Sequence, residues 1–290
     1  MVEPRKSGRP GGHPPAKRKV SYGASRGHAA PAGGSPRPER PRKAGQISPN
    51  RRHGFGQGKR PYDYSYYEKA EATPKYLAEL FGKNNFTVSK RELSAYWKYY
   101  CLLREHNAAL DLTRIMGIEA TVLKHFIDCA IVADMVPLAK TLVDIGSGPG
   151  FPGVPLALRC PETKVILAES RGKRVRFLEM VKKELGLDNV EIFPRSVTAD
   201  TPLEAEDFIT RAVEVIPATL ARLAPFIPVG GRALFMKGPS CGQEVTDAQQ
   251  QFKGVFKMTA DIRYELVQRD QQRRLVVFTK REESPRPGGE

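Results

Sequence analysis

A short glycine-rich segment has the residue types that bind a nucleotide-like cofactor. Asp144 ends an apolar run, and the segment after it supplies Gly146, Ser147, Gly148 and Gly150. Glycines permit a tight turn and let a ligand approach the bare backbone, and a helix that begins near Pro152 would add unpaired N–H groups. Glu169 ends the next apolar run, where a carboxylate can accept hydrogen bonds from both hydroxyls of a ribose.

Phe151 indicates which cofactor this loop suits. The dinucleotide pattern G-x-G-x-x-G requires a glycine at position 151, and a phosphate-binding loop requires GK[ST], and neither is present. The sequence instead has G-x-G-x-G after an acid, which is typical of class I methyltransferases. We therefore predict S-adenosylmethionine as the cofactor, with Asp144 suited to its zwitterionic methionine end. The alternative is a glycine turn of purely structural use.

Short apolar runs alternate with helical patterns from residue 140 onward. The expected strands are 141–146, 164–169, 189–193, 207–212 and 232–238, and the expected helices are about 152–159, 172–186 and 214–226. Nearly continuous apolar runs are typical of parallel strands buried on both faces. The alternation predicts an α/β fold with a doubly wound, mostly parallel sheet. Two late strands, within 252–267 and 273–280, are expected to form an antiparallel pair at one edge.

The preceding segment is predicted to be helical. Apolar residues recur at helical spacing within 74–81, 89–109 and about 118–135. Ser89 and Glu92 form a predicted capping box at the start of the second helix. We therefore expect a helical N-terminal cap at 61–139, an S-adenosylmethionine-binding domain at 140–281 and a flexible C-terminus at 282–290.

The first 60 residues have a different composition from the rest. They contain 15 Lys and Arg, two acids, nine prolines and eleven glycines, and so hold most of the chain's net charge of +15. Such a segment buries too little apolar surface to offset its chain entropy, so we predict a disordered basic tail. It is interpreted as an electrostatic arm for RNA. A solvated tail without a specific partner is the alternative.

Other features exclude several classes of protein. No run of 18 apolar residues is present, and no apolar stretch follows the basic N-terminus, so neither a membrane span nor a secretory signal is expected. The four cysteines are widely spaced and form no CxxC, which argues against a metal site and a disulfide framework. These features favour a cytoplasmic protein. Nothing in the sequence indicates an oligomer.

Several segments together resemble one family. The sequence DIGSGPGFPGVPLAL resembles the cofactor loop of the ribosomal RNA small subunit methyltransferase G family, also called the glucose-inhibited division protein B family. Further similar segments follow the family's order: NAALDLT (107–113), LKHFIDCA (123–130), SRGKRVRFL (170–178), TRAV (210–213) and MKG (236–238). Asp111, Lys124 and Glu169 stand where the family usually has Asn, Arg and Asp, and residues 195–202 depart further.

The resemblance, which covers about residues 90–280, implies a fold and a reaction. It implies a class I, Rossmann-like methyltransferase that moves a methyl group from S-adenosylmethionine to N7 of a guanosine in 16S ribosomal RNA. The implied partner is that RNA or the small ribosomal subunit. The implied cofactor contacts are Gly146, Phe151, Arg211 and the pair Ser196-Val197, which would border the adenine.

The chemistry of a guanine N7 acceptor fits what the sequence contains. N7 presents a lone pair and no proton, so its attack on a methyl group requires no general base. Enzymes that methylate cytosine C5 need Pro-Cys, whereas Cys160-Pro161 has the reverse order. Amino-group enzymes usually have [DNS]PP[YF] after the fourth strand, where this chain has ITRAVEV. We therefore predict catalysis mainly by positioning, which can contribute about 7–11 kcal/mol.

The candidate catalytic residues are Arg211, His125, Asp128 and Lys237. Arg211 follows a buried strand at the end of the sheet where ligands bind, and it is expected to grip a phosphate or the base. His125 and Asp128 are three residues apart on one helix and are expected to approach each other, either in the site or as a lock between cap and sheet. For Lys237, contact with the substrate and a structural ion pair are weighed as equal alternatives.

Two broader alternatives remain at this point. The rivals of the N7 methyltransferase are a class I methyltransferase that acts on another RNA and an RNA-binding ribosome-assembly factor that keeps the cofactor fold without turnover. The basic helix with Arg171, Lys173, Arg174 and Arg176 is interpreted either as an RNA track or as a solvated face. Gly146, Gly148, Gly150, Glu169 and Arg211 are all present, which favours an active enzyme.

Overall fold

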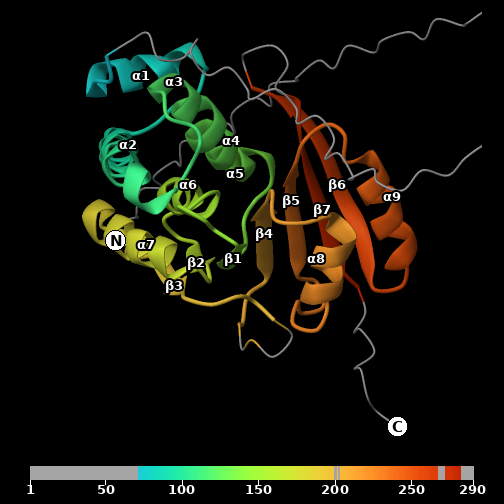
Figure 1. Ribbon diagram of the computed structural model, residues 1–290. Coiled ribbons are helices and arrows are strands. Elements are labelled where there is room, and N and C mark those ends of the chain that lie inside the picture. Colours follow the sequence, from blue (N-terminus) through green and yellow to red (C-terminus); the bar gives the residue numbers. More distant parts are fainter. Residues whose placement is uncertain (1–70, 199–200, 202, 267–271, 282–290) are drawn as a thin grey trace, which may run out of the picture. The chain divides into compact units, whose positions relative to one another are not determined.

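A seven-stranded sheet with helices on both faces forms the centre of the protein (Figure 1). This computed structural model describes residues 71–198, 201, 203–266 and 272–281. The predicted tail at 1–60, the start of the cap at 61–70 and the predicted flexible C-terminus at 282–290 lie outside the described residues. The strand order is β3-β2-β1-β4-β5-β7-β6.

The five predicted parallel strands are confirmed. They are β1 (Thr141–Ile145), β2 (Lys164–Ala168), β3 (Val190–Phe193), β4 (Asp207–Arg211) and β5 (Arg232–Lys237). β1 pairs in parallel with β2 on one side and with β4 on the other. The strand order therefore reverses beside β1, and the carboxyl ends of strands at such a point are where α/β sheets bind ligands.

The two late strands also form as predicted. β7 (Gln272–Lys280) pairs antiparallel with β5, and β6 (Phe256–Glu265) pairs antiparallel with β7 at the edge of the sheet. A helix that the sequence analysis did not predict, α9 (Gly242–Gln251), lies between β5 and these strands. The fold class, a doubly wound and mostly parallel sheet, is thereby confirmed.

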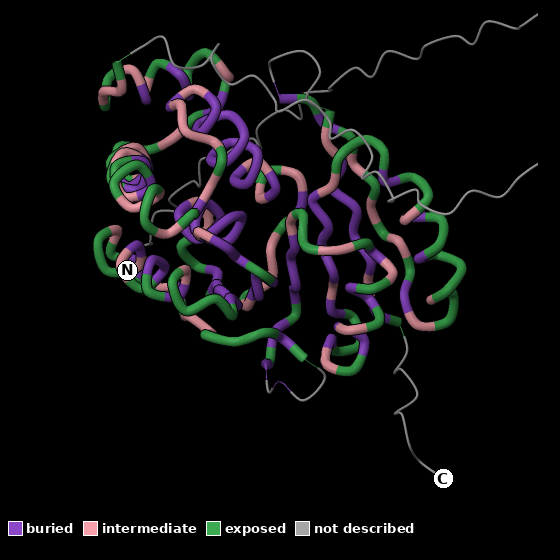
Figure 2. Tube along the Cα trace, viewed as in Figure 1, coloured by how far each residue is buried: buried purple, intermediate pink, exposed green. Residues whose placement is uncertain are grey.

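Strand residues alternate between two apolar layers. Leu142, Leu167 and Leu234 belong to a core cluster shared with α6 (Gly153–Arg159), α7 (Gly172–Leu185) and the N-terminal helices. Val143, Ile166 and Phe235 belong to a second cluster, shared with α8 (Ile216–Leu223) and α9. The strands are consequently buried on both faces (Figure 2).

The helical cap begins with α1 (Pro74–Lys83) and α2 (Lys90–Leu110). The predicted capping box is confirmed, because the backbone N–H of Glu92 donates to Ser89 Oγ at 3.1 Å and that of Ser89 donates to Glu92 Oε2 at 2.7 Å. None of the helices in the described ranges is both long and apolar enough to cross a membrane.

The third predicted helix, about 118–135, is not one regular helix. It consists of α3 (Ile118–Thr121), η2 (Val122–Ile127), α4 (Asp128–Ala130) and α5 (Val132–Met135). The segment η2 is a π-helix, in which each N–H bonds to the carbonyl five residues earlier and the turn is wider. Such turns occur frequently at functional sites, and this one holds His125.

Candidate active site

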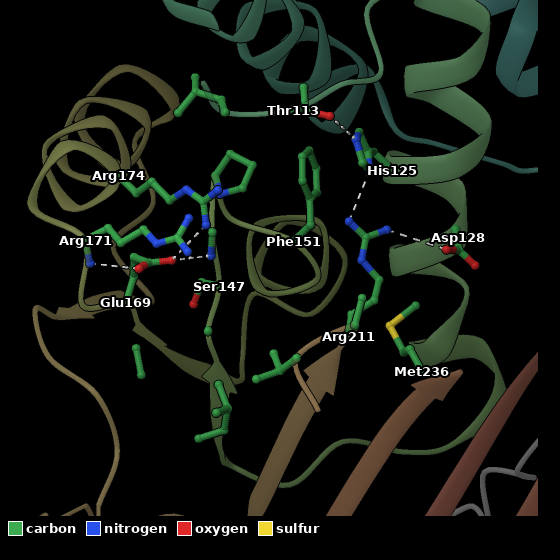
Figure 3. Close-up of a pocket in the computed structure, with 18 of the residues that line it drawn as sticks. Thr113, His125, Asp128, Ser147, Phe151, Glu169, Arg171, Arg174, Arg211 and Met236 are labelled. Carbon is green, nitrogen blue, oxygen red and sulfur yellow. Dashed lines mark hydrogen bonds and ion pairs between the residues drawn. The ribbon is translucent and has the colours of Figure 1, made fainter. Parts of the chain in front are cut away.

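A cavity of about 860 Å³ opens at the carboxyl ends of β1, β2, β4 and β5 (Figure 3). Its size is within the range of small-molecule sites, about 300–1,000 Å³. Eleven of the predicted site residues line it: His125, Asp128, Gly146, Ser147, Gly148, Phe151, Glu169, Ser196, Val197, Arg211 and Lys237. Two predicted cofactor residues, Asp144 and Gly150, are not part of its lining.

The glycine loop adopts backbone conformations that favour glycine. Gly146, Gly148 and Gly150 have φ angles of 69°, 59° and 111°. At Gly150 space is also short, because a Cβ there would lie 2.6 Å from Tyr99 Oη. Tyr99 donates a hydrogen bond to the carbonyl of Pro149 at 2.6 Å, so the cap holds the loop in place. Gly150 is thus required for the close packing behind the loop.

Asp144 also acts from behind the loop. Its side chain is fully buried, and Oδ2 accepts a hydrogen bond of 2.8 Å from the N–H of Gly153, the first residue of α6. Burial raises the pKa of Asp144 from 3.8 to about 7. Its Oδ1 has no hydrogen-bond partner among the described residues. In this structure Asp144 joins β1 to the start of α6 instead of lining the cavity.

Glu169 is fixed at the cavity wall by backbone groups. Its Oε2 accepts from the N–H of Gly148 at 3.0 Å, and its Oε1 accepts from the N–H of Arg171 at 2.8 Å. Arg174 Nη1 lies 3.7 Å from Oε2. The carboxylate is only 6% exposed, yet it lines the cavity, and its remaining lone pairs can accept from the hydroxyls of a ribose.

The wall beside Glu169 contains the pair that the resemblance assigns to the adenine. Val197 is buried and Ser196 is exposed, and both line the cavity next to Ala168. The chain is stabilised just after them by a hydrogen bond of 2.7 Å from the N–H of Thr198 to Thr201 Oγ1. An apolar side chain beside an exposed hydroxyl suits the face and the edge of a base.

Arg211 is the centre of the polar contacts on the opposite wall. Its Nη1 donates to the carbonyl of Lys124 at 2.9 Å, and its Nη2 contacts His125 Nδ1 at 3.1 Å. Asp128 Oδ2 lies 3.6 Å from Nη1. The guanidinium also lies 5.4 Å from the ring centroid of Phe151, within the range of a cation–π contact. Arg211 therefore connects β4, η2, α4 and the glycine loop.

His125 is held as a neutral ring. It stacks on Phe151 with centroids 4.3 Å apart and an interplanar angle of 11°. Its Nε2 lies 2.9 Å from Thr113 Oγ1. Burial, followed by the charge of Arg211, lowers the pKa of His125 well below its usual value. The predicted approach of His125 and Asp128 occurs through Arg211, which contacts both.

Asp128 links the cavity to the late strands. Tyr264 donates from its hydroxyl to Asp128 Oδ1 at 2.9 Å, and Arg273 Nε lies 3.7 Å from the same oxygen. Sequence reasoning did not single out Tyr264 or Arg273, because their contacts with Asp128 join segments that are distant in the chain. Thr113 ends the segment NAALDLT, which the resemblance covers, but no role was expected for it. Asp128 thus lines the cavity and also joins the cap to the late strands of the sheet, and its part in the reaction stays a prediction.

Lys237 lines the cavity, but its ammonium group is bonded on the protein side. Nζ donates to the carbonyl of Glu214 at 2.6 Å and to Glu244 Oε2 at 2.8 Å. The second contact is an ion pair with α9, and the first holds the loop that follows β4. The contacts of Lys237 are therefore those of a structural ion pair, which was one of the two roles considered for it.

The cavity wall has a marked excess of positive charge. The cationic residues that line it are Lys124, Arg171, Arg174, Arg211, Arg222, Lys237 and Arg273, against the two carboxylates Asp128 and Glu169. Of the basic helix, Arg171 and Arg174 line the cavity, whereas Lys173 and Arg176 are exposed. No cluster of side chains suited to a metal ion occurs in the described part of the chain.

Comparison with known proteins identifies the family. The family model described as rRNA small subunit methyltransferase G matches residues 92–275. The chain is also 35% identical over 236 residues to "Ribosomal RNA small subunit methyltransferase G 2" of Bdellovibrio bacteriovorus, covering 80% of this chain and 91% of that protein. The chain belongs to the rRNA small subunit methyltransferase G family.

Two other comparisons show greater differences in length or sequence. A family relative of the same name in Syntrophobacter fumaroxidans is 38% identical over 205 residues, which cover 71% of this chain but 41% of that longer protein. A solved ribosomal protein L11 methylase from Lactobacillus delbrueckii subsp. bulgaricus has 13% identity and a TM-score of 0.41, over 53% of this chain and 75% of its own. The second likeness is distant.

The residues of this member of the methyltransferase G family fit the cofactor that the glycine loop predicted, S-adenosylmethionine. Gly146 and Gly148 line the cavity, and Glu169 presents a fixed carboxylate beside them. Val197 and Phe151 are buried side chains that add apolar surface to the cavity wall. The cofactor prediction is confirmed by membership in a methyltransferase family, and these residues are the ones expected to hold it.

Proposed function

We propose that this protein transfers a methyl group from S-adenosylmethionine to N7 of a guanosine in 16S ribosomal RNA, within the small ribosomal subunit or its free RNA, in the cytoplasm. The names of its relatives and the matched family model support a ribosomal RNA substrate. The resemblance described above supports N7 as the acceptor atom. The assignment of site residues below is part of the same proposal.

The charge of the cavity is the observation that supports an RNA substrate most strongly. Seven cationic residues and two carboxylates line it. Even with Glu214 and Glu244, which bond Arg222 and Lys237 from outside the lining, the site has more cations than carboxylates. A concave surface of one sign concentrates ligands of the opposite charge. The negatively charged phosphodiester backbone of RNA fits this surface better than a neutral small molecule does.

The side chains of the cavity also fit an acceptor that has no proton to lose. His125 is the residue type that most often acts as a general base, but its Nδ1 accepts a hydrogen bond from Arg211. None of the four cysteines lines the cavity, so no thiol nucleophile is available there. Guanine N7 requires neither group, and both absences agree with the expectation of catalysis by positioning.

The mechanism then depends on alignment of donor and acceptor. When bound, S-adenosylmethionine would supply a methyl group on a positively charged sulfur, and this sulfur would leave as a neutral thioether when the methyl group passes to the N7 lone pair. Glu169 and the glycine loop orient the donor from one wall, while Arg211 is set by His125, Lys124 and Asp128 on the other. The guanidinium of Arg211 is positioned to bind a phosphate or the guanine edge.

A methyl-transfer assay with labelled S-adenosylmethionine tests this function. Purified protein is incubated with small ribosomal subunits, with naked 16S RNA and with large subunits, and the RNA is then digested to nucleosides. We expect 7-methylguanosine from one or both of the 16S substrates and none from the large subunit. Cofactor binding without transfer to any RNA would instead support an assembly factor, and label in another nucleoside would refute the N7 assignment.

A further inference from the structure

Two exposed valines follow β4, and the first of them, Val213, lines the cavity. Among the described residues, the exposed large apolar side chains are Val213, Val215 and Val229. Val213 is 42% exposed and lines the cavity, and Val215, two residues later, is 50% exposed. Single exposed apolar residues are common on protein surfaces. Two exposed valines two residues apart, one of which lines a mostly cationic cavity, are a more specific feature.

The loop that contains these valines is held by its polar groups. Lys237 Nζ donates to the carbonyl of Glu214, and Glu244 Oε2 accepts from the N–H of Ile216 at 3.0 Å. The side chain of Glu214 contacts Arg222 and accepts a hydrogen bond of 3.2 Å from Thr219 Oγ1. The carbonyl and the Oε1 of Glu214 and the N–H of Ile216 are therefore bonded to the protein, while the side chains of Val213 and Val215 remain about half exposed.

Ala212 sets the direction of this loop. Its φ angle of +56° is in the left-handed region, which costs a residue with a Cβ about 1–2 kcal/mol. The chain turns there directly after Arg211, and Val213 then packs on the glycine loop, since a Cβ on Gly146 would lie 3.0 Å from Val213 Cγ2. Strain of this kind persists where the surrounding structure enforces it, and it occurs often at binding sites.

We propose that Val213 and Val215 form an apolar platform that contacts the face of the acceptor base. A nucleobase has a flat face without hydrogen-bonding groups and polar edges around it. The valine methyl groups can cover that face without removing water from polar atoms, while the cations of the wall remain available to the edges and the phosphates. Val213 belongs to the loop after β4 and packs against Gly146 of the glycine loop, so a base on the platform is next to the cofactor. This inference rests on the proposed function.

The test compares Val213→Ser/Val215→Ser with a matched control, Val229→Ser. Val229 is 55% exposed and lies in the turn before β5, outside the cavity lining. We expect the double variant to lower kcat/KM for small subunits about tenfold through the lost apolar contact, with cofactor Kd within about twofold of the wild-type value. The control is expected to match the wild type, and Val215→Ser alone is expected to show a smaller loss.

The outcomes separate this inference from the function it rests on. Wild-type methyl transfer with equal kcat/KM in the double variant and the control overturns the platform alone. A loss of cofactor affinity as large as the loss of kcat/KM also overturns it, because the valines would then be cofactor contacts. If the wild-type protein transfers no methyl group to RNA, the proposed acceptor is wrong and the platform falls with it.

Discussion

Arg211 and His125 form a contact of 3.1 Å between Nη2 and Nδ1 that fixes the tautomer of the histidine ring. A guanidinium can only donate hydrogen bonds, so Nδ1 must accept and the ring proton must be on Nε2. That nitrogen faces Thr113 Oγ1 at 2.9 Å. Both ring nitrogens are thereby engaged within the protein, which supports the proposal that His125 orients Arg211 and Phe151 instead of exchanging protons.

Replacement of Arg211 by lysine is predicted to lower kcat/KM for small subunits by at least about tenfold, because an ammonium group cannot reproduce the planar, bidentate contacts of a guanidinium. Lysine is preferred to alanine, because it keeps a positive charge beside the buried carboxylate of Asp128. Steady-state kinetics measure the change in kcat/KM, and the chemical shifts of the His125 ring report whether its contact with residue 211 is kept.

Arg232→Lys is a matched control for that experiment. Arg232 donates to both carboxylate oxygens of Asp207 at 2.7 and 2.6 Å, at the amino end of the same sheet. It is expected to change stability while leaving kcat/KM unaltered. Equal kinetic losses in Arg211→Lys and Arg232→Lys would show that the effect of Arg211 is one of stability only.

Glu169→Gln is predicted to weaken binding of S-adenosylmethionine about tenfold or more, since hydrogen bonds to a charged group contribute about 1.5–3 kcal/mol each. Glutamine retains one acceptor oxygen, but its amide group faces one of the two N–H donors that the carboxylate accepts from. Isothermal titration of the cofactor measures the change. The control is Glu191→Gln. Glu191 lies on β3 and forms an exposed ion pair with Lys164 of β2, so its replacement is expected to leave the Kd for S-adenosylmethionine unchanged.

Asp144 gives a prediction about pH. Because burial raises its pKa from 3.8 to about 7, the folded state binds a proton that the unfolded state has already lost. The stabilisation from this proton is complete below about pH 4 and is lost as the pH rises through 7. The free energy of unfolding of the wild type should therefore decrease relative to that of Asp144→Asn between pH 5 and 8. A difference that stays constant over this range contradicts the assignment.

Deletion of residues 1–60 is predicted to weaken RNA binding and to reduce its salt dependence. This segment contains 15 Lys and Arg and two acids, and each phosphate contact that it makes adds to the slope of log K against log salt. Cofactor affinity should not change. Filter binding at several salt concentrations measures the slope, and an identical slope after deletion argues for a solvated tail.

The parts of the fold that depend on local pattern were predictable. The strands around Asp144 and Glu169 and the capping box of Ser89 and Glu92 formed within a residue or two of expectation. Helix α9 escaped prediction because its sequence is mostly polar and buries only Val245 and Ala248. The π-helix around His125 has no periodicity of its own that distinguishes it from an α-helix.

The parts of the site that depend on distant contacts were not predictable. Tyr264 reaches Asp128 across 136 residues of sequence, and nothing near either residue indicates that pairing. Asp144 was expected to face the cofactor because it lies at the carboxyl end of the first strand, just before the glycine loop. In the sheet it instead follows the alternation of Leu142, toward the layer that contains α6. A sequence gives the position of such a side chain along a strand, whereas its environment depends on the packing of other elements.

The most direct test is a map of 7-methylguanosine in 16S ribosomal RNA from cells with the gene, without it, and with the gene restored as wild type or as Arg211→Lys. We expect a single modified guanosine that disappears on deletion, returns with the wild-type gene and stays much reduced with the variant. A 16S RNA whose 7-methylguanosine content and positions are the same in all four strains would refute the proposed function.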